Sequence, residues 1–235
     1  MITEAQQQEI LSYLSVKKLP IDMLIEVYDH FISQIHDLQA RHNLCFDDAF
    51  QKTKDSWCND LTPYWNGGWE LENRSDLVRN FEKTMLKSVF FESVKYAGII
   101  VLASFVLSLL FPKEIFQYLI LLLIVIMVFA PIIKIIRNWK AVNLPKKHSK
   151  FTLTLYQNYV MIHLSMAYFL FKSVSDYKVF VDAFLHVSTL EWQVFGILFI
   201  YLALATICLF TWLSLNRYLV QIKKVEAFIL THQLN

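Results

Sequence analysis

Four apolar runs follow residue 92, and they constrain the fold more than any other feature of the sequence. Each run reaches the roughly 20 residues that an α-helix needs to cross the hydrocarbon core of a bilayer. Pro112 separates the first run from the second, because proline cannot continue a helix. The sequence therefore predicts an all-α protein with a four-helix transmembrane bundle. The predicted spans are residues 93–111, 115–136, 153–171 and 193–215.

The composition agrees with a membrane protein and divides the chain into two parts of opposite charge. Of the 235 residues, 56% are hydrophobic and only 18% are charged, which is too apolar for an ordinary soluble domain. Residues 1–92 carry 15 acidic and 9 basic side chains, whereas residues 93–235 carry 5 and 13. Because nucleic-acid binding needs clustered cations, the acidic first part argues against nucleic acid as a direct partner.

The basic side chains of the second part gather at one end of the predicted spans, where they indicate the orientation. Cations accumulate on the cytoplasmic side of membrane proteins, so both termini are predicted to be cytoplasmic and the protein to lie in the cytoplasmic (inner) membrane. A hydrophobic helical bundle in water is the alternative that this charge asymmetry disfavours. The end of the second run and the link to the third hold no acid and six cations: Lys134, Arg137, Lys140, Lys146, Lys147 and Lys150.

The domain organisation follows from the same pattern. Residues 1–66 are predicted to form a small cytoplasmic helical domain, and residues 67–92 a hinge and a juxtamembrane helix. The Gly67-Gly68 pair marks the hinge, and the helix that begins near Leu71 is expected to continue into the first span. Residues 93–217 hold the four spans, and residues 218–235 form a cytoplasmic tail.

The stretch "LPIDMLIEVYDHFISQI" predicts an amphipathic helix with one apolar and one polar face. At about 100° per residue, its apolar side chains fall on one side and its acids, Asp22 included, on the other. The apolar face would pack on a core and the polar face would meet water or a partner. The candidate partner-binding residues on the polar face are Glu26, Asp29, His30, Ser33 and Asp37.

Two stretches resemble a known family. "YLSVKKLPIDMLIEVYDHFISQI", followed by "CFDDAFQKTKDSW", resembles the HAAS-type helical domain of bacterial membrane signalling proteins over about residues 5–62. The resemblance rests on the Leu-Pro break, on the acidic amphipathic helix with Asp-His near its middle, and on the Phe-Asp-Asp-Ala-Phe helix start. It implies a cytoplasmic module ahead of several spans, frequently paired with PadR-like transcriptional regulators. It implies no catalytic residues.

Metal and cofactor chemistry finds little support in the sequence. Glu26 and His30 lie one helical turn apart, but a dedicated site needs three or four convergent ligands, so we expect no metal. The three cysteines, Cys45, Cys58 and Cys208, form no CxxC pattern. Nucleotide-binding loops and nucleophile motifs are absent from the sequence, so we expect no cofactor and no enzymatic activity.

Polar residues in the third run leave a second interpretation open. His163 lies near the middle of that run, with Gln157 and Asn158 before it, and an ionisable group at membrane depth is a candidate functional site. The three could serve a small transporter or an intramembrane enzyme, or His163 could be a neutral hydrogen-bonding group between spans. In the segment outside the membrane, Asp182 and His186 lie one turn apart and could form a surface salt bridge or a ligand-sensing pair.

These observations favour a non-enzymatic membrane protein in signalling, or a regulatory or accessory subunit. Its expected partners are the lipid bilayer and a protein on the cytoplasmic side, either a transcriptional regulator or a larger membrane complex.

Overall fold

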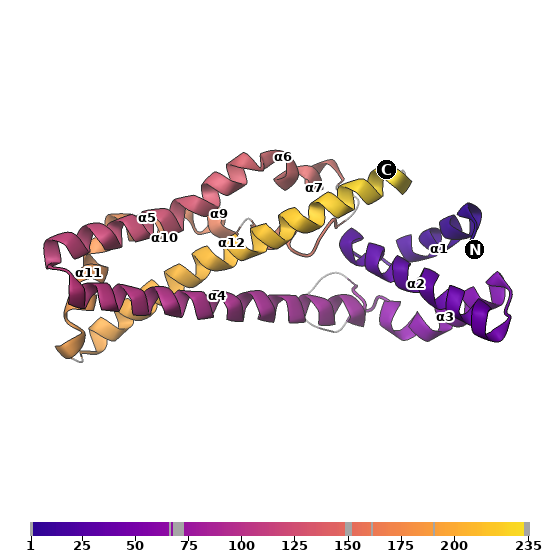
Figure 1. Ribbon diagram of the computed structural model, residues 1–235, viewed down its shortest axis with the longest axis horizontal. Coiled ribbons are helices and arrows are strands. Elements are labelled where there is room, and N and C mark those ends of the chain that lie inside the picture. Colours follow the sequence, from indigo (N-terminus) through magenta and orange to yellow (C-terminus); the bar gives the residue numbers. More distant parts are fainter. Residues whose placement is uncertain are drawn as a thin grey trace. The chain divides into compact units, whose positions relative to one another are not determined.

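The computed structural model is helical throughout, apart from its loops and one isolated antiparallel bridge between Tyr64 and Arg74 (Figure 1). The all-α prediction is therefore confirmed over the part of the chain that the structure describes. The described residues are 2–65, 67, 73–148, 152–160, 162–189 and 191–232.

The chain divides into two compact units that do not follow the order of the sequence. The head unit comprises residues 1–85, 144–155 and 220–235, and the span unit comprises residues 86–143 and 156–219. Residues 144–155, which we call the connector, thus belong with the N-terminal helices although two predicted spans separate them along the chain. Helices α4 (Asp76–Leu110) and α12 (Trp192–His232) contribute residues to both units.

Three helices form the centre of the head unit: α1 (Glu4–Ser15), α2 (Ile21–His42) and α3 (Phe46–Leu61). Thr3 and Gln6 form a capping box at the start of α1, and the Cys45 sulfur accepts the Asp48 N–H at the start of α3. Asn43 ends α2 in the left-handed conformation that asparagine tolerates, with φ of 52°.

The core of the head unit forms where the apolar faces of these helices meet. Phe31 of α2 is completely buried, and its ring lies 5.9 Å from that of Tyr13 and 5.6 Å from that of Trp57. The apolar face predicted for α2 therefore packs on α1 and α3. The residues of that face that are fully buried are Ile21, Leu24, Val27, Tyr28, Phe31 and Ile35.

Within the described ranges, three helices are long and apolar enough to cross a membrane: α4, α5 (Lys113–Arg137) and α12. At about 1.5 Å per residue, even the 25 residues of α5 exceed the roughly 30 Å of the hydrocarbon core. Because Pro112 follows Leu110 closely, α4 ends and α5 begins at the predicted turn. The membrane-protein class is thus supported, and the first apolar run is part of one 35-residue helix that starts at Asp76.

Polar contacts between α4 and α12 fix their register within the span unit. The hydroxyls of Ser104 and Tyr201 lie 3.1 Å apart in the buried interior. Further along both helices, the Arg217 guanidinium donates to the Glu92 carboxylate at 2.6 Å and to the Ser88 hydroxyl at 3.3 Å. These contacts join the two helices at one buried and one partly exposed position.

The third predicted span differs from the prediction. Instead of one long helix over residues 153–171, the described residues form three short ones: α8 (Gln157–Val160), α9 (Ile162–Ser165) and α10 (Ala167–Ser175). Residues 152–156 precede them without helical structure. The Ser165 hydroxyl donates to the Ile162 carbonyl at 2.7 Å just before the break at Met166, and such local bonds compete with helix propagation.

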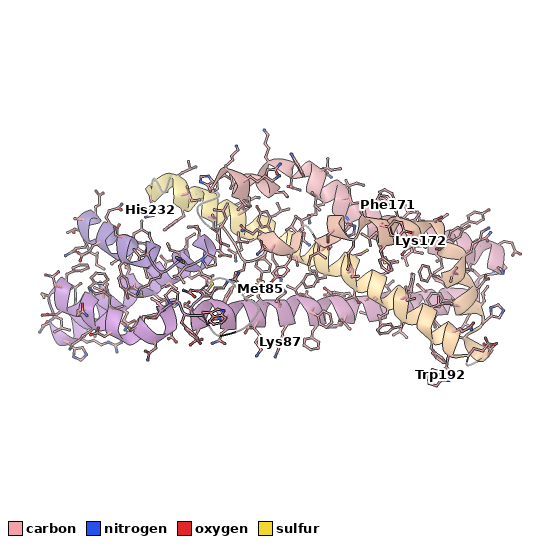
Figure 2. The ribbon with its side chains drawn as sticks, turned by 180° about the vertical axis from the view of Figure 1, so that it is seen from behind. Met85, Lys87, Phe171, Lys172, Trp192 and His232 are labelled. Atoms are coloured by element: carbon pink, nitrogen blue, oxygen red, sulfur yellow. The ribbon has the colours of Figure 1, made fainter. Side chains whose placement is uncertain are left out.

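These short helices pack along α5 in the opposite direction. The Phe171 ring of α10 (Figure 2) lies 5.7 Å from that of Phe129, and helix α11 (Tyr177–Leu185) brings Phe184 to 6.1 Å from Phe116 at the start of α5. Four-residue helices α6 (Trp139–Val142) and α7 (Leu144–Lys147) precede this part of the chain, and the 3₁₀ turn η1 (Val187–Thr189) follows it.

The predicted C-terminal tail is helical. Helix α12 continues without a break to His232, and the end of this 41-residue helix belongs to the head unit. There the Phe228 and His232 rings lie 6.1 and 5.9 Å from the Tyr28 ring of α2. The last turns of the chain are therefore part of the head's structure rather than a separate extension.

Candidate functional site

The predicted partner-binding residues form an exposed row on one side of α2. All five of them are exposed to solvent: Glu26, Asp29, His30, Ser33 and Asp37. Within the row, the Ser33 hydroxyl donates to the Asp29 carbonyl at 2.9 Å. The Asp37 carboxylate lies 3.8 Å from the Arg41 guanidinium, and both side chains are so exposed that this pair contributes little to stability.

Helix α3 holds this face of α2 in place. The Gln34 amide accepts the Trp57 indole N–H at 2.9 Å and donates to the Ser56 hydroxyl at 3.0 Å. The His30 ring lies 6.3 Å from the Trp57 ring, so one edge of His30 is supported while the side chain stays exposed. The polar face is therefore presented by a packed pair of helices, with its carboxylates directed away from the core.

The chemistry of this face is that of exposed, separate polar and charged groups. Among the residues that the structure describes, no group of three or more His, Cys, Asp or Glu side chains is arranged to hold a metal ion. Exposed carboxylates spaced over several turns offer charge and hydrogen-bond acceptors to a partner. They lack the enclosed surroundings in which a carboxyl group is tuned for proton transfer.

The polar residues of the third run do not share one environment. His163 is completely buried, and its Nε2 lies 2.8 Å from the Val128 carbonyl of α5. Its Nδ1 has no hydrogen-bond partner within the described part of the chain. Asn158 is exposed and Gln157 is half-buried. The contact with Val128 makes His163 a cross-link between α9 and α5, the polar role that the sequence offered as an alternative.

The other predicted pair, Asp182 and His186, does not form a salt bridge. The Asp182 carboxylate instead contacts the Lys113 ammonium at 2.9 Å, and His186 Nδ1 lies 2.8 Å from the Asp182 backbone carbonyl. The His186 imidazole therefore contacts the helix backbone rather than the Asp182 carboxylate. Both side chains line an open pocket of about 290 Å³, together with Glu191 and Gln193 near the start of α12. Trp192 projects away from that end of α12 and is 90% exposed (Figure 2).

One acidic residue of α2 lies on the opposite face from the one that its sequence pattern predicts. Asp22 was expected on the polar face, but the structure buries it, leaving 8% of the residue exposed. Burial raises the pKa of the Asp22 carboxyl to about 7 from its ordinary 3.8. Asp22 lies next to the connector, and a helical wheel of α2 alone cannot show contacts with a segment that is distant in the sequence. The available signal was Pro20, which precedes α2 and has no side-chain group to cap it.

Comparison with protein-family models, with curated proteins and with solved structures finds no match to this chain. The resemblance of residues 5–62 to the HAAS-type domain therefore stays a prediction.

Proposed function

We propose that this is a non-enzymatic integral membrane protein whose head unit binds a protein partner on the cytoplasmic side, as a signalling protein or as a regulatory subunit of a membrane complex. The observation that carries the proposal is the exposed acidic face of α2, supported from behind by α3. Such a rigid, charged helix face suits a basic surface of a folded partner, since complementary charge steers association and fixes register.

The composition of the head unit supports a shared compartment for its three parts. The backbone N–H of Ile21 donates to the Thr152 carbonyl at 2.8 Å, and the Tyr28 ring contacts those of Phe228 and His232. Segments that touch must lie on the same side of a bilayer. The connector and the end of α12 contribute the cations Lys146, Lys147, Lys223 and Lys224, so the positive-inside rule assigns this side to the cytoplasm.

The connectivity also supports a fourth crossing, although α8–α10 are short. The chain leaves the head unit along α4, returns through α5 to the connector, leaves again after residue 155 and returns along α12. In the proposed topology, residues 156–191 therefore carry the chain across the membrane once. A broken helix is tolerated at membrane depth where protein covers it. The packing of α9, α10 and α11 on α5 provides such a cover.

A pull-down from membranes tests the partner proposal. The full-length chain, extracted in mild detergent, is used as bait for the wild type and for a Glu26→Lys/Asp29→Lys variant, and captured proteins are quantified by mass spectrometry. The matched control reverses two exposed acids of α3, Asp55→Lys/Asp60→Lys. We expect a partner that the wild type and the control retain and that the α2 variant loses at least tenfold. Equal retention by both variants overturns the assignment of the surface.

A second candidate function, a small transporter or an intramembrane enzyme, is favoured by one observation only, the unpartnered Nδ1 of buried His163. A transport role requires a water path to that nitrogen. In a His163→Cys variant of a chain whose exposed Cys45 and Cys58 are replaced by serine, a membrane-impermeant thiol reagent would then label the site from one side, measured against the same chain with only the buried Cys208. We expect no labelling, because His163 serves here as a cross-link between helices.

A further inference from the structure

The start of α2 has hydrogen-bonding requirements that its own sequence does not meet. The first N–H groups of any helix lack intrahelical acceptors, and a side chain before the helix normally supplies one. Pro20 occupies that position and makes no side-chain cap. The connector supplies the acceptors instead. The Ile21 N–H donates to the Thr152 carbonyl at 2.8 Å, and the Asp22 N–H donates to the Leu153 carbonyl at 3.1 Å.

The Asp22 carboxyl completes this arrangement from the side of α2. Its Oδ1 accepts the Met23 N–H at 3.0 Å, which satisfies the third free group of the helix. The carboxyl also accepts the backbone N–H of Leu155. Asp22 therefore bonds both to the helix that it begins and to the connector. We call the contacts of Ile21 and Asp22 with Thr152, Leu153 and Leu155 the clasp.

The end of the connector is a buried, non-helical segment of the head unit. Leu153 and Thr154 are fully buried and Leu155 is 3% exposed, so three successive residues fill the space beside α2. Helix α8, the first of the short helices of the span unit, begins two residues later at Gln157. The clasp therefore holds the segment directly before α8 against α2, the helix that carries the acidic face.

We propose that the clasp is a proton-controlled lock, in which protonation of the Asp22 carboxyl holds the connector against α2 and ionisation loosens it. The device concerns the chain itself and does not depend on the proposed protein partner. Its chemistry is the loss or gain of one proton by one carboxyl, exchanged with solvent as the clasp opens.

Among the residues that the structure describes, no cation acts on the Asp22 carboxyl. The charged side chain that does act on it is Glu26, one turn along α2, whose like charge raises the pKa of Asp22 further. The connector residues of the clasp have no ionisable side chains. The other described charged groups on the neighbouring segments are not among the causes of this shift: Lys17 and Lys18 before α2, Lys146, Lys147 and His148 of the connector, and Lys223, Lys224, Glu226 and His232 on α12.

The direction of the pH effect follows from the position of the pKa. Burial raises the pKa of Asp22 to about 7 in the closed clasp, although the backbone N–H groups of Met23, Leu155 and Asp22 lower it, whereas the ordinary value of 3.8 applies once the carboxyl is exposed. Between these values the closed form binds a proton that the open form releases. The clasp thus weakens by about tenfold per pH unit between about pH 4 and pH 7, and changes little above that range.

Hydrogen exchange of the full-length chain in nanodiscs tests the lock directly, because the Ile21 and Asp22 amides are its donors. The readout is the protection factor of the peptide that covers residues 19–24, with each rate divided by the intrinsic rate at that pH. We expect protection to fall about 100-fold from pH 5 to pH 8, most of it below pH 7. Peptides from α1 and α3 serve as internal controls for the folded head.

Two variants separate the lock from a merely structural contact. Asp22→Asn keeps an acceptor for the Met23 and Leu155 N–H groups but does not titrate, so its protection should not change with pH. Glu26→Gln removes the like charge and should move the midpoint of the wild-type transition toward lower pH. Equal protection at pH 5 and pH 8 in the wild type, or an unchanged pH dependence in Asp22→Asn, overturns the proposal.

Discussion

The head unit and the span unit have similar interiors and opposite exteriors. Each buries large aromatic side chains completely, Phe31 in the head and Tyr201 in the span unit. On the outside, the head exposes acids along α2, whereas Leu102 and Leu109 of α4 are 66% and 70% exposed. Close packing is common to both units, so it is the surface that indicates the surroundings of each, water for the head and lipid for the spans.

The largest effect should come from removing the centre of the head core. Phe31→Ala deletes a ring that contacts Tyr13 and Trp57, and such core truncations cost about 3–5 kcal/mol. We expect amide protection to collapse in α1–α3 while α5 keeps its protection, as measured by hydrogen exchange of the full-length chain. Phe199→Ala, at a residue of α12 that is 70% exposed, is the control and should leave both units unchanged. A similar loss in both variants would remove the distinction between core and surface.

The next effect tests the opposite exteriors. Leu102→Asp places a charge on the exposed apolar side of α4, at a cost of about 3 kcal/mol if lipid surrounds that position. We expect a lower fraction of membrane-integrated protein after alkaline extraction. The same change at exposed Val16 of the head should have little effect, because water surrounds that residue. If Val16→Asp were as damaging as Leu102→Asp, the two surfaces would not face different solvents.

The smallest effect concerns a single hydrogen bond inside the span unit. Ser104→Ala removes the contact with the Tyr201 hydroxyl, and hydrogen bonds between membrane helices average about 0.6 kcal/mol. A small decrease in the unfolding midpoint in mixed detergent micelles is the expected result. Ser108→Ala is the matched control, because that hydroxyl donates only to Phe105 of its own helix. A loss above about 2 kcal/mol would mean that the span unit depends on polar contacts as strongly as the head does.

The sequence predicts best where one segment alone determines the outcome. The periodicity of α2 identifies its buried face, since Phe31 and Ile35 are fully buried and Glu26 and Asp29 are exposed. The apolar runs of α4, α5 and α12 identify three helices of membrane length, because length and hydropathy are local properties. In each case the local property that the sequence shows, a helical periodicity or a long apolar run, is also the property that determines the structure of that segment.

The sequence predicts poorly where distant segments meet. Aspartate is usually a surface residue, yet Asp22 is buried by the connector, which lies about 130 positions further along the chain. The run over residues 153–171 is apolar enough for a span, but its first residues cap α2 and Ser165 bonds to its own backbone, so the helix is interrupted. The end of α12 carries no apolar run of membrane length, and its place in the head depends on contacts with distant residues such as Tyr28.

The capping of α2 by the connector sets an order for assembly during synthesis. The ribosome produces Ile21 and Asp22 long before Thr152 and Leu153, so the nascent N-terminal helices wait with two backbone donors that only water satisfies. In the proposed topology, those donors reach their final acceptors only after the first two membrane helices have been inserted and the chain has emerged again beside them. A chain stalled before that stage would differ from the finished protein at the beginning of α2.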